Sequence, residues 1–389
     1  MSRKIKENVF LLNATDWNRR LFDSLIPLPD GTSYNAYLIN GSEKTALLDT
    51  VDPSMVNVLF DHLKNVEKLD FIISFHSEQD HSGAIPDVLE KYPNAKVLTS
   101  TKGKDMIIDH LSVPEEKIVT VEDGEELSLG NKTLKFIYYP WVHWPETMLA
   151  YLKEDKILFT CDLFGSHLAT TDMYATDECE VYEAAKRYYA EIMMPFKKII
   201  KKNISKFDEY DIDIIAPSHG PMYDKPEFII NAYKDWISDN VKNIVVIPYI
   251  SMHGSVEKMV QHLVDELEEK GVKVYKFDLT VTDIGKLAIT LVDAATIVIG
   301  TPTVLGEPHP AVTYAAKLAN LLKPKTKFAS VIASYGWGSN VIEKVAEMIP
   351  NIKAEVIDPV LVKGYPKEDD FNSIDKLANE IYKKHKTIT

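Results

Sequence analysis

Hydrophobic and polar positions follow two different patterns along the chain. Before about residue 240, short apolar runs are separated by turn signals such as Asp30-Gly31 and Asn40-Gly41, which is typical of strands joined as hairpins. The strands predicted in this first part are Asn8–Asn13, Tyr34–Asn40, Lys44–Thr50, Phe71–Phe75, Ala95–Thr99, Thr133–Tyr139, Met148–Leu152, Ile157–Cys161 and Ile212–Ala216. Helices are predicted over Asp52–Asn65, from Ile85 onward, over Val181–Ile200 and over Glu227–Val241. Hairpins first and helices later indicate two packed sheets that are covered by helices.

From Lys242 the pattern becomes a regular alternation of apolar strands and amphipathic helices. The predicted strands are Ile244–Ile250, Val272–Asp278, Thr296–Thr301, Phe328–Ala333 and Ala354–Val362. The predicted helices are Val256–Lys270, Pro310–Leu322, Ser339–Met348 and Phe371–Lys384. Strands this apolar, alternating with helices, indicate a parallel sheet that is covered on both faces. We therefore expect an α/β chain of two domains, residues 1–241 and 242–389.

Composition and charge narrow the class of protein. A hydrophobic content of 45% and a charged content of 26% are typical of a globular chain, and the net charge of −14 argues against a nucleic-acid partner. No apolar run reaches the roughly 20 residues that a membrane span needs, and the N-terminus does not resemble a secretion signal. We expect no membrane association and a cytoplasmic location. Cys161 and Cys179 form no CxxC pair, which excludes an internal rubredoxin-type centre.

Seven candidate metal ligands follow predicted strands of the first part. Four of them lie in His76-Ser77-Glu78-Gln79-Asp80-His81, directly after Phe71–Phe75. We expect this segment to be a loop that folds around an ion, with His76, Glu78 and Asp80 at alternate positions and His81 facing a second ion. His143, Asp162 and His219 each follow a later strand. A single such residue is more often a packed histidine or a turn aspartate, but their joint order predicts a two-metal site.

Three segments of the second part follow predicted strands and suit a cofactor. Ser251-Met252-His253-Gly254-Ser255 opens a helix, where glycine and small hydroxyl residues let backbone N–H groups wrap a phosphate. Thr301-Pro302-Thr303-Val304 and Ser334-Tyr335-Gly336-Trp337-Gly338 follow the third and fourth strands. Aromatic residues among glycines beyond the strand ends suit stacking on a flat ring system. Ordinary helix caps resemble the first of these segments, so it is weak evidence by itself.

The ligand order of the first part resembles that of the metallo-β-lactamase fold, H-x-H-x-D-H followed by His, Asp and His. Glu78 stands where the hydrolases of that fold carry their second histidine. A carboxylate in this position adds negative charge and a hard oxygen ligand, which favours iron over zinc. The second part resembles flavodoxin, although Val256 stands where flavodoxin-like loops usually carry a threonine.

Together the two parts resemble the flavodiiron proteins, or A-type flavoproteins, over nearly the whole chain. The segments Tyr34–Leu38 and His143–Thr147 also resemble this family. The resemblance implies a metallo-β-lactamase-like αββα sandwich followed by a flavodoxin-like doubly wound sheet that binds FMN. It implies two irons, one held by His76, Glu78 and His143 and the other by Asp80, His81 and His219, with Asp162 as the bridge. His167, five residues after Asp162, is a candidate proton donor, with a packed role as the alternative.

The same resemblance implies an activity and its partners. Members of the family reduce dioxygen to water, nitric oxide to nitrous oxide, or both. Since this chain carries neither a rubredoxin nor a flavin-reductase domain, its electrons would come from an external donor, reduced rubredoxin or reduced coenzyme F420. The resemblance also implies a head-to-tail homodimer, or a homotetramer built from such dimers.

Two other functions remain compatible with these motifs. The first is a metal-dependent hydrolase of the lactamase fold with a fused flavodoxin module, against which Glu78 argues. The second is a flavin electron carrier or redox sensor whose metal site is structural, against which the full set of seven ligands argues. Iron analysis and a test for steady consumption of gas would separate them.

Overall fold

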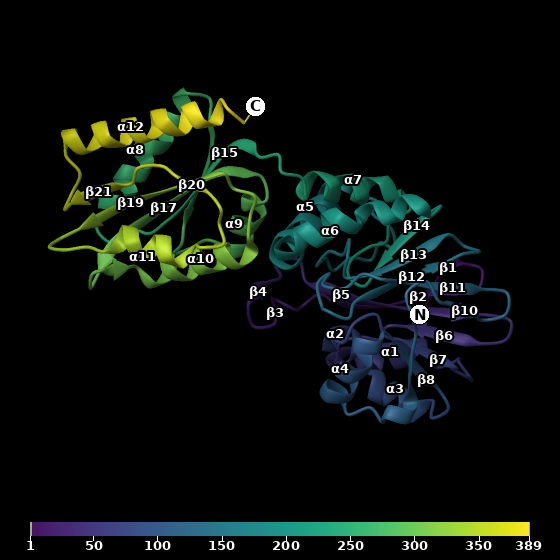
Figure 1. Ribbon diagram of the computed structural model, residues 1–389. Helices are drawn as coiled ribbons and strands as arrows, with labels where there is room; N and C mark the ends of the chain where they lie inside the picture. Colours follow the sequence, from purple (N-terminus) through teal and green to yellow (C-terminus); the bar gives the residue numbers. More distant parts are fainter. Residues whose placement is uncertain (1, 389) are drawn as a thin grey trace. The chain divides into compact units, whose positions relative to one another are not determined.

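The computed structural model describes residues 2–388, which divide into two compact units. The first unit comprises residues 2–189 and 196–234, and the second comprises residues 190–195 and 235–388. Both are shown in Figure 1, where colour follows the sequence. None of the helices within residues 2–388 is long and apolar enough to cross a membrane.

The first unit contains two large sheets. The strands of the first sheet, in spatial order, are β1 (Arg3–Lys6), β2 (Val9–Asp16), β5 (Thr32–Asn40), β6 (Thr45–Leu48), β7 (Phe71–Ile73), β8 (Lys96–Thr99) and β9 (Ile118–Thr120). Those of the second sheet are β10 (Glu126–Ser128), β11 (Thr133–Tyr138), β12 (Met148–Leu152), β13 (Ile157–Cys161) and β14 (Ile214–Pro217). Strands β3 (Leu21–Phe22) and β4 (Ile26–Pro27) form a separate hairpin. The neighbours from β6 to β9 are parallel, as are β13 and β14, so their carboxyl ends can carry ligand loops.

Helices cover the sheets of the first unit on their outer faces (Figure 1). They are α1 (Val56–His62), α2 (Gln79–Ser82), α3 (Ile85–Lys91), α4 (Thr101–Leu111), α5 (Glu178–Tyr188), α6 (Lys197–Asn203) and α7 (Pro226–Trp236). Leu38 and Ile72 of the first sheet share one buried core with Val88 of α3 and Ile107 of α4. On the opposite face, the ring of Tyr37 lies 4.9 Å from that of Phe159 in the second sheet. The predicted arrangement of two packed sheets under helices is therefore confirmed.

The second unit is a parallel sheet with helices on both faces. Its strands are β15 (Lys242–Tyr249), β16 (Lys273–Asp278), β17 (Ala294–Val304), β18 (Glu307–Pro308), β19 (Phe328–Tyr335), β20 (Glu355–Val356) and β21 (Val360–Lys363). Its helices are α8 (Ser255–Glu269), α9 (Ile284–Leu291), α10 (Pro310–Leu322), α11 (Val341–Met348) and α12 (Glu368–His385). The order β16-β15-β17-β19-β20, with α8 and α12 on one core and α9, α10 and α11 on the other, is that of a doubly wound fold. This part of the prediction is also confirmed.

Several predicted elements are broken where the backbone cannot continue. The single helix predicted over Val181–Ile200 is wrong, because α5 gives way to a π-helical segment (Tyr189–Met193) and a 3-10 turn (Met194–Phe196) before α6. Pro195 has no N–H for a helical hydrogen bond. The single strand predicted over Ala354–Val362 is likewise split into β20 and β21, and Pro359 lies in the gap. Both interruptions therefore coincide with a proline.

Other elements are shorter than predicted or were not predicted at all. The helix predicted over Asp52–Asn65 begins as a 3-10 turn, and its α-helical part ends at His62. Helices α4 and α9 were missed. The two remaining 3-10 segments are Glu115–Lys117 and Ile204–Glu209.

Candidate metal centre

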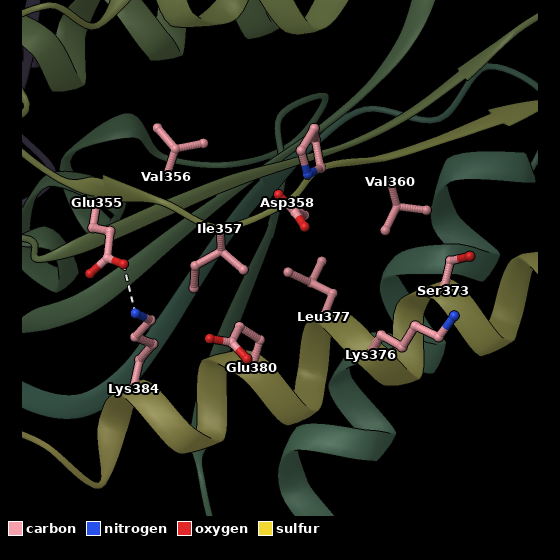
Figure 2. Close-up of a pocket in the computed structure, with 11 residues that line it drawn as sticks. Glu355, Val356, Ile357, Asp358, Val360, Ser373, Lys376, Leu377, Glu380 and Lys384 are labelled. Atoms are coloured by element: carbon pink, nitrogen blue, oxygen red, sulfur yellow. Dashed lines mark hydrogen bonds and ion pairs between the residues drawn. The ribbon is translucent and has the colours of Figure 1, made fainter.

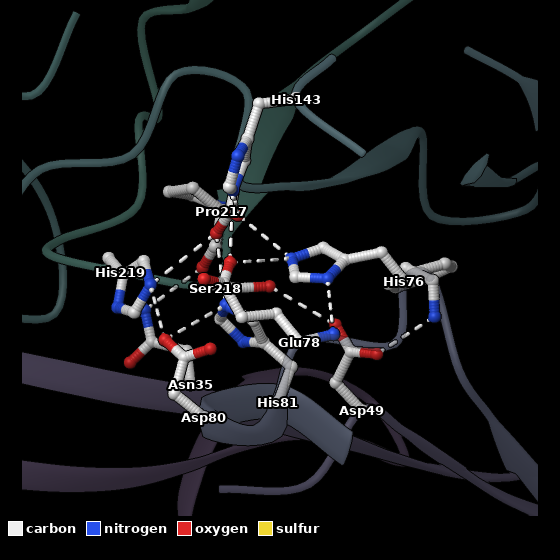
Figure 3. A network of polar contacts seen from close by, with 12 residues as sticks. Asn35, Asp49, His76, Glu78, Asp80, His81, His143, Pro217, Ser218 and His219 are labelled. Atoms are coloured by element: carbon white, nitrogen blue, oxygen red, sulfur yellow. Dashed lines mark hydrogen bonds and ion pairs between the residues drawn. The ribbon is translucent and has the colours of Figure 1, made fainter. Parts of the chain in front are cut away.

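The seven predicted ligands lie together in the first unit, as Figure 3 shows for six of them by name. They form two groups, His76 with Glu78, His143 and Asp162, and Asp80 with His81 and His219. In each group, one possible ligand atom per residue can be chosen so that all of them lie within 4.8 Å of one another. The ligands come from segments far apart in the sequence, which follow β7, β11, β13 and β14. The composition of each group agrees with the ligand set that the sequence predicted.

Asp162 lies between the two groups. Its Oδ2 atom is 2.8 Å from His76 Nε2 and 2.9 Å from His143 Nε2. Its Oδ1 atom is 3.0 Å from His81 Nε2 and 3.4 Å from His219 Nε2. Each oxygen therefore faces a different group, which is the placement that a carboxylate needs in order to bridge two ions.

Several polar atoms of the two groups lack hydrogen-bond partners in the part of the chain that the structure describes. Both carboxylate oxygens of Asp80, His81 Nε2 and Asp162 Oδ1 are buried and have no hydrogen-bond partner among the described residues. His81 Nε2 and Asp162 Oδ1 are close, yet they do not meet hydrogen-bond geometry. Burying such groups without partners is costly. Four imidazoles and three carboxylates that converge in this way fit a pair of transition-metal ions.

The segment after β7 is not the open loop that the sequence predicted. Gln79–Ser82 forms the short helix α2, which places Asp80 and His81 on consecutive helical positions. Asp80 Oδ2 consequently lies 3.2 Å from His219 Nε2 in the second group, while Glu78 Oε2 lies 3.0 Å from His143 Nε2 in the first. A helical turn rotates each residue by about 100°, so Asp80 does not continue the alternation of His76 and Glu78 and lies with His81 in the second group.

The carboxyl groups of Asp80 and Asp162 are held in the ionised form that binds metal ions. Burial alone would raise the pKa of Asp162, but His81, His76 and His143 hold it well below its usual range. Burial opposes the ionised form of Asp80 in the same way, and His81 and His219 nevertheless lower its pKa to about 2. Both side chains are therefore carboxylates at neutral pH. The Nδ1 atom of His219 lies 2.7 Å from the carbonyl oxygen of Ser33 and donates to it, which leaves the Nε2 lone pair free for an ion.

Two buried carboxylates support the centre without belonging to either group. Asp49 accepts hydrogen bonds from Phe75 N–H at 2.9 Å and from the Ser218 hydroxyl at 3.2 Å, and these residues precede His76 and His219. Burial raises the pKa of Asp49 to about 6. Glu146 accepts from Ser77 N–H at 2.7 Å. Sequence reasoning missed both roles, since a lone acidic residue near a strand carries no signal; Glu146 lay inside a segment noted only for its family resemblance.

His167 lies beside the second group and not in it. Its ring centroid is 4.8 Å from those of His219 and Tyr188, and its Nδ1 atom lies 2.9 Å from the Thr32 hydroxyl. Burial, reinforced by His219, holds the pKa of His167 well below its usual range. This imidazole is therefore neutral at neutral pH. A role in proton transfer stays a prediction.

The predicted cofactor segments meet at the carboxyl edge of the parallel sheet in the second unit. The hydroxyls of Ser255 and Ser334 are 3.0 Å apart, and those of Thr303 and Ser339 are 2.9 Å apart. Gly254 caps α8 with a φ of +79°, and a Cβ added there would meet no described atom within 4 Å. The Ser251 hydroxyl is buried and lacks a hydrogen-bond partner within residues 2–388. An open, glycine-lined loop with a free hydroxyl at a helix N-terminus fits a phosphate.

Two of these segments begin inside strands instead of after them. Ser334 and Tyr335 are the last two residues of β19. Thr301–Val304 does not follow a strand but forms the end of β17. Thr301 and Pro302 pair with β19, and the next two residues form a hairpin with β18. These four residues, which are apolar or β-branched, therefore continue the strand beyond its predicted end. His309, at the start of α10, accepts from Ala311 N–H through Nδ1 at 3.2 Å and so serves as a helix cap.

Comparison with known proteins agrees with this geometry. Residues 32–220 match the family model described as ODP family beta lactamase, and residues 247–374 match that described as Flavodoxin. The chain is 34% identical to the nitric oxide reductase of Moorella thermoacetica, with 97% of each chain covered. It is 32% identical to the coenzyme F420H(2) oxidase of Methanothermobacter marburgensis, with 98% of each covered.

Solved structures give the same result. Rubredoxin oxygen:oxidoreductase from Desulfovibrio gigas superposes with a TM-score of 0.96 at 28% identity, covering 100% of this chain and 99% of that one. The flavodiiron protein of Giardia intestinalis superposes with a TM-score of 0.94 at 25% identity, covering 100% and 97%. The chain belongs to the flavodiiron protein family. The predicted fold and family are therefore confirmed.

This flavodiiron protein has one more cluster of possible ligands, in its second unit. His262 and Glu266 of α8 lie near Asp375 of α12. His262 Nε2 is 2.6 Å from Asp375 Oδ1, and Glu266 pairs with Lys270 at 2.8 Å. Asp375 and Glu266 thus each have a side-chain partner without an ion.

The flavodiiron chain also has a cavity of about 380 Å³ between β20, β21 and α12 (Figure 2). Charged and apolar side chains line it, and among them Lys384 Nζ is 2.6 Å from Glu355 Oε1. None of the predicted cofactor residues lines this cavity. It therefore has no part in the sites described above.

Proposed function

We propose that this chain is a flavodiiron oxidoreductase that reduces dioxygen to water, nitric oxide to nitrous oxide, or both. Electrons would come from an external donor and pass through FMN to a pair of irons. The observation that supports this most directly is the carboxylate Glu78 in the first ligand group, where a hydrolase of the same fold carries a histidine. It adds a third negative charge, with Asp80 and Asp162, to a centre of four imidazoles. Such a donor set suits iron, whereas zinc has no redox chemistry.

The seven ligands would divide between the metals as the geometry groups them. His76, Glu78 and His143 would hold one iron, Asp80, His81 and His219 the other, and Asp162 would bridge. When bound, the irons supply gas binding and electron storage, and FMN supplies electrons from the donor. The chain's own part is to keep Asp80 and Asp162 ionised, to orient His219 through Ser33, and to bury the site away from bulk water.

In the second unit, the FMN phosphate would bind at the Ser251–Ser255 loop. Val256 has no hydroxyl to offer the phosphate, and its side chain is fully buried in the core between the sheet and α8. The phosphate would therefore depend on the free Ser251 hydroxyl, on Ser255 and on backbone N–H groups. Tyr335, the last residue of β19, and Trp337, two residues beyond it, would flank the flavin ring; Trp337 is 89% exposed, which leaves its face available for stacking.

The names of relatives suggest substrates and donors for this chain. One relative is a nitric oxide reductase and another a coenzyme F420H(2) oxidase, and a third is a rubredoxin-oxygen oxidoreductase of Megalodesulfovibrio gigas, 29% identical over 97% of this chain. We propose nitric oxide and dioxygen as the candidate gases, and rubredoxin and reduced F420 as the candidate donors. We further propose a head-to-tail homodimer that brings the flavin of one chain to the irons of the other.

Metal and flavin analysis of protein purified without oxygen tests the cofactor part of this proposal. We expect two irons and one FMN per chain, with the yellow absorption of an oxidised flavin. Asp162→Asn should lower the iron content and leave the FMN content unchanged, because only the bridge is altered. Two zincs and no flavin absorption would favour the hydrolase instead. Iron and FMN bound without any consumption of gas would favour the electron carrier.

A further inference from the structure

Glu146 is a buried carboxylate that the ligand set does not use. It lies three residues after His143, in the turn before β12, and only 3% of it is exposed. Its Oε1 atom accepts a hydrogen bond of 2.7 Å from the backbone N–H of Ser77. Its own backbone carbonyl accepts from the Ser100 hydroxyl at 2.9 Å, which fixes the turn against the start of α4.

The hydrogen bond to Ser77 holds a segment that carries two of the metal ligands. Ser77 lies between His76 and Glu78, and His143 lies on the same turn as Glu146. The Glu146 side chain thus connects the two segments that carry the three unshared ligands of the first group, although Glu146 and Ser77 are 69 residues apart. The backbone also joins these segments, since Met148 N–H donates to Phe75 O at 2.9 Å, and Glu146 adds a contact two residues further along, between the ligands His76 and Glu78.

We propose that Glu146 is a positioning residue for the iron held by His76, Glu78 and His143. This inference rests on the proposed function, because it presupposes that the two groups bind iron. Burial of a carboxylate is costly, and its Oε2 atom has no hydrogen-bond partner in the described part of the chain. A destabilising buried group of this kind is expected where it holds the geometry of a functional site.

The second ligand group has contacts of its own, although the Ser82 hydroxyl at the end of α2 donates to Ser77 O at 2.9 Å. Asp80 and His81 are carried by α2, where Gly83 N–H bonds to Gln79 O at 2.8 Å. His219 is fixed by the bond to Ser33, and Ser218 before it by Asp49. Loss of the Glu146 contact should therefore weaken one iron and spare the other.

Three variants test this selectivity. Glu146→Ala removes the acceptor, and Glu146→Gln keeps an amide oxygen that can accept from Ser77. Asp70→Ala is the matched control, because Asp70 Oδ2 accepts Thr45 N–H at 3.0 Å just before β7, at the end of the strand away from the centre. Each protein is loaded with Fe²⁺ without oxygen and titrated with a chelator, and iron, FMN and Tm are measured.

We expect wild-type protein to retain two irons and the alanine variant to release one of them about 10- to 100-fold more readily. The glutamine variant should release iron as the wild type does, and FMN content should not change in any variant. Asp70→Ala should lower the Tm and keep both irons. If Glu146→Ala does not fold, Glu146→Asp, which withdraws the carboxylate by one methylene, should show the same selective loss.

Several results would overturn the assignment. Retention of both irons in Glu146→Ala, or equal loss of both, would show that Glu146 does not position one group. A glutamine variant as weak as the alanine variant would show that charge matters and not the hydrogen bond. Wild-type protein that takes up no iron at all would instead contradict the proposed function.

Discussion

Glu78 is the side chain that separates this chain from hydrolases with the same fold. We predict that Glu78→His lowers iron affinity at least about tenfold and raises zinc affinity, because a neutral imidazole replaces a hard, charged oxygen ligand. Metal analysis of protein produced with iron and zinc both present measures the change. Glu90→His, an exposed position on α3, should leave the iron content as it is. Unchanged iron in the Glu78 variant would refute our account of this residue.

Gly254 is the corresponding test for the flavin. We predict that Gly254→Asp lowers FMN affinity at least about tenfold, because it puts a negative charge where the phosphate is expected to bind. Gly271→Asp is a well-matched control: Gly271 has a φ of +71°, has no described atom within 4 Å of an added Cβ, and lies just beyond the other end of α8. Fluorescence titration of FMN measures both. Equal losses in the two variants would mean that backbone strain, and not charge, is responsible.

Helices and strands were predicted well where a periodic apolar pattern is long, as in β15, α8 and α10. Prediction failed where local chemistry overrides the pattern. Pro195 and Pro359 interrupt a helix and a strand, and β17 stays extended beyond its predicted end. The short helix α2 could not be predicted, since four residues contain too little periodicity to distinguish a turn from a loop.

The sequence predicted the ligands of the site but not the buried residues that hold them in place. All seven ligand positions could be read from the order of residues after strands, and the structure brings all of them together. Their partition between two groups came from family resemblance, because it depends on the helical turn at Asp80. Asp49 and Glu146 were beyond reach, since their roles arise from backbone groups brought near them only by folding.

The end of α12 carries a pH-dependent contribution to stability. His385 is 2% exposed, with Nδ1 at 2.7 Å from Asn243 Oδ1 and Nε2 at 2.7 Å from Thr296 Oγ1. Burial lowers its pKa from 6.5 to about 4. The unfolded chain therefore takes up this proton first as the pH falls, and the stabilisation by the neutral form, present above pH 6.5, is lost between pH 6.5 and 4.

We predict that this one histidine accounts for up to about 3 kcal/mol of the fall in unfolding free energy over that range. Urea unfolding of wild type and His385→Gln at pH 7, 5.5 and 4.5 measures it. The variant should be less stable at pH 7, and its stability should fall less steeply with acidification. Parallel pH curves for the two proteins would contradict the assignment.

The chain as a whole must bring flavin and irons together, and the proposed head-to-tail dimer does so between subunits. Asp162→Asn should disable the irons and Gly254→Asp the flavin, so each variant alone should be inactive. After subunit exchange, half of the dimers would be mixed, and each would contain one working flavin–iron pair. Roughly a quarter of the wild-type activity should then return. Demonstrated exchange with no activity would mean that electrons pass within one chain.

The central claim, that this chain is a gas-reducing flavodiiron enzyme, is tested most directly by turnover. Protein loaded with iron and FMN is first mixed anaerobically with reduced rubredoxin or with reduced F420. Dioxygen or nitric oxide is then added, and the consumption of each gas is followed separately. We predict steady, enzyme-dependent consumption of at least one gas with at least one donor, lost in Asp162→Asn. Fully loaded protein that oxidises no donor and consumes neither gas would contradict the account.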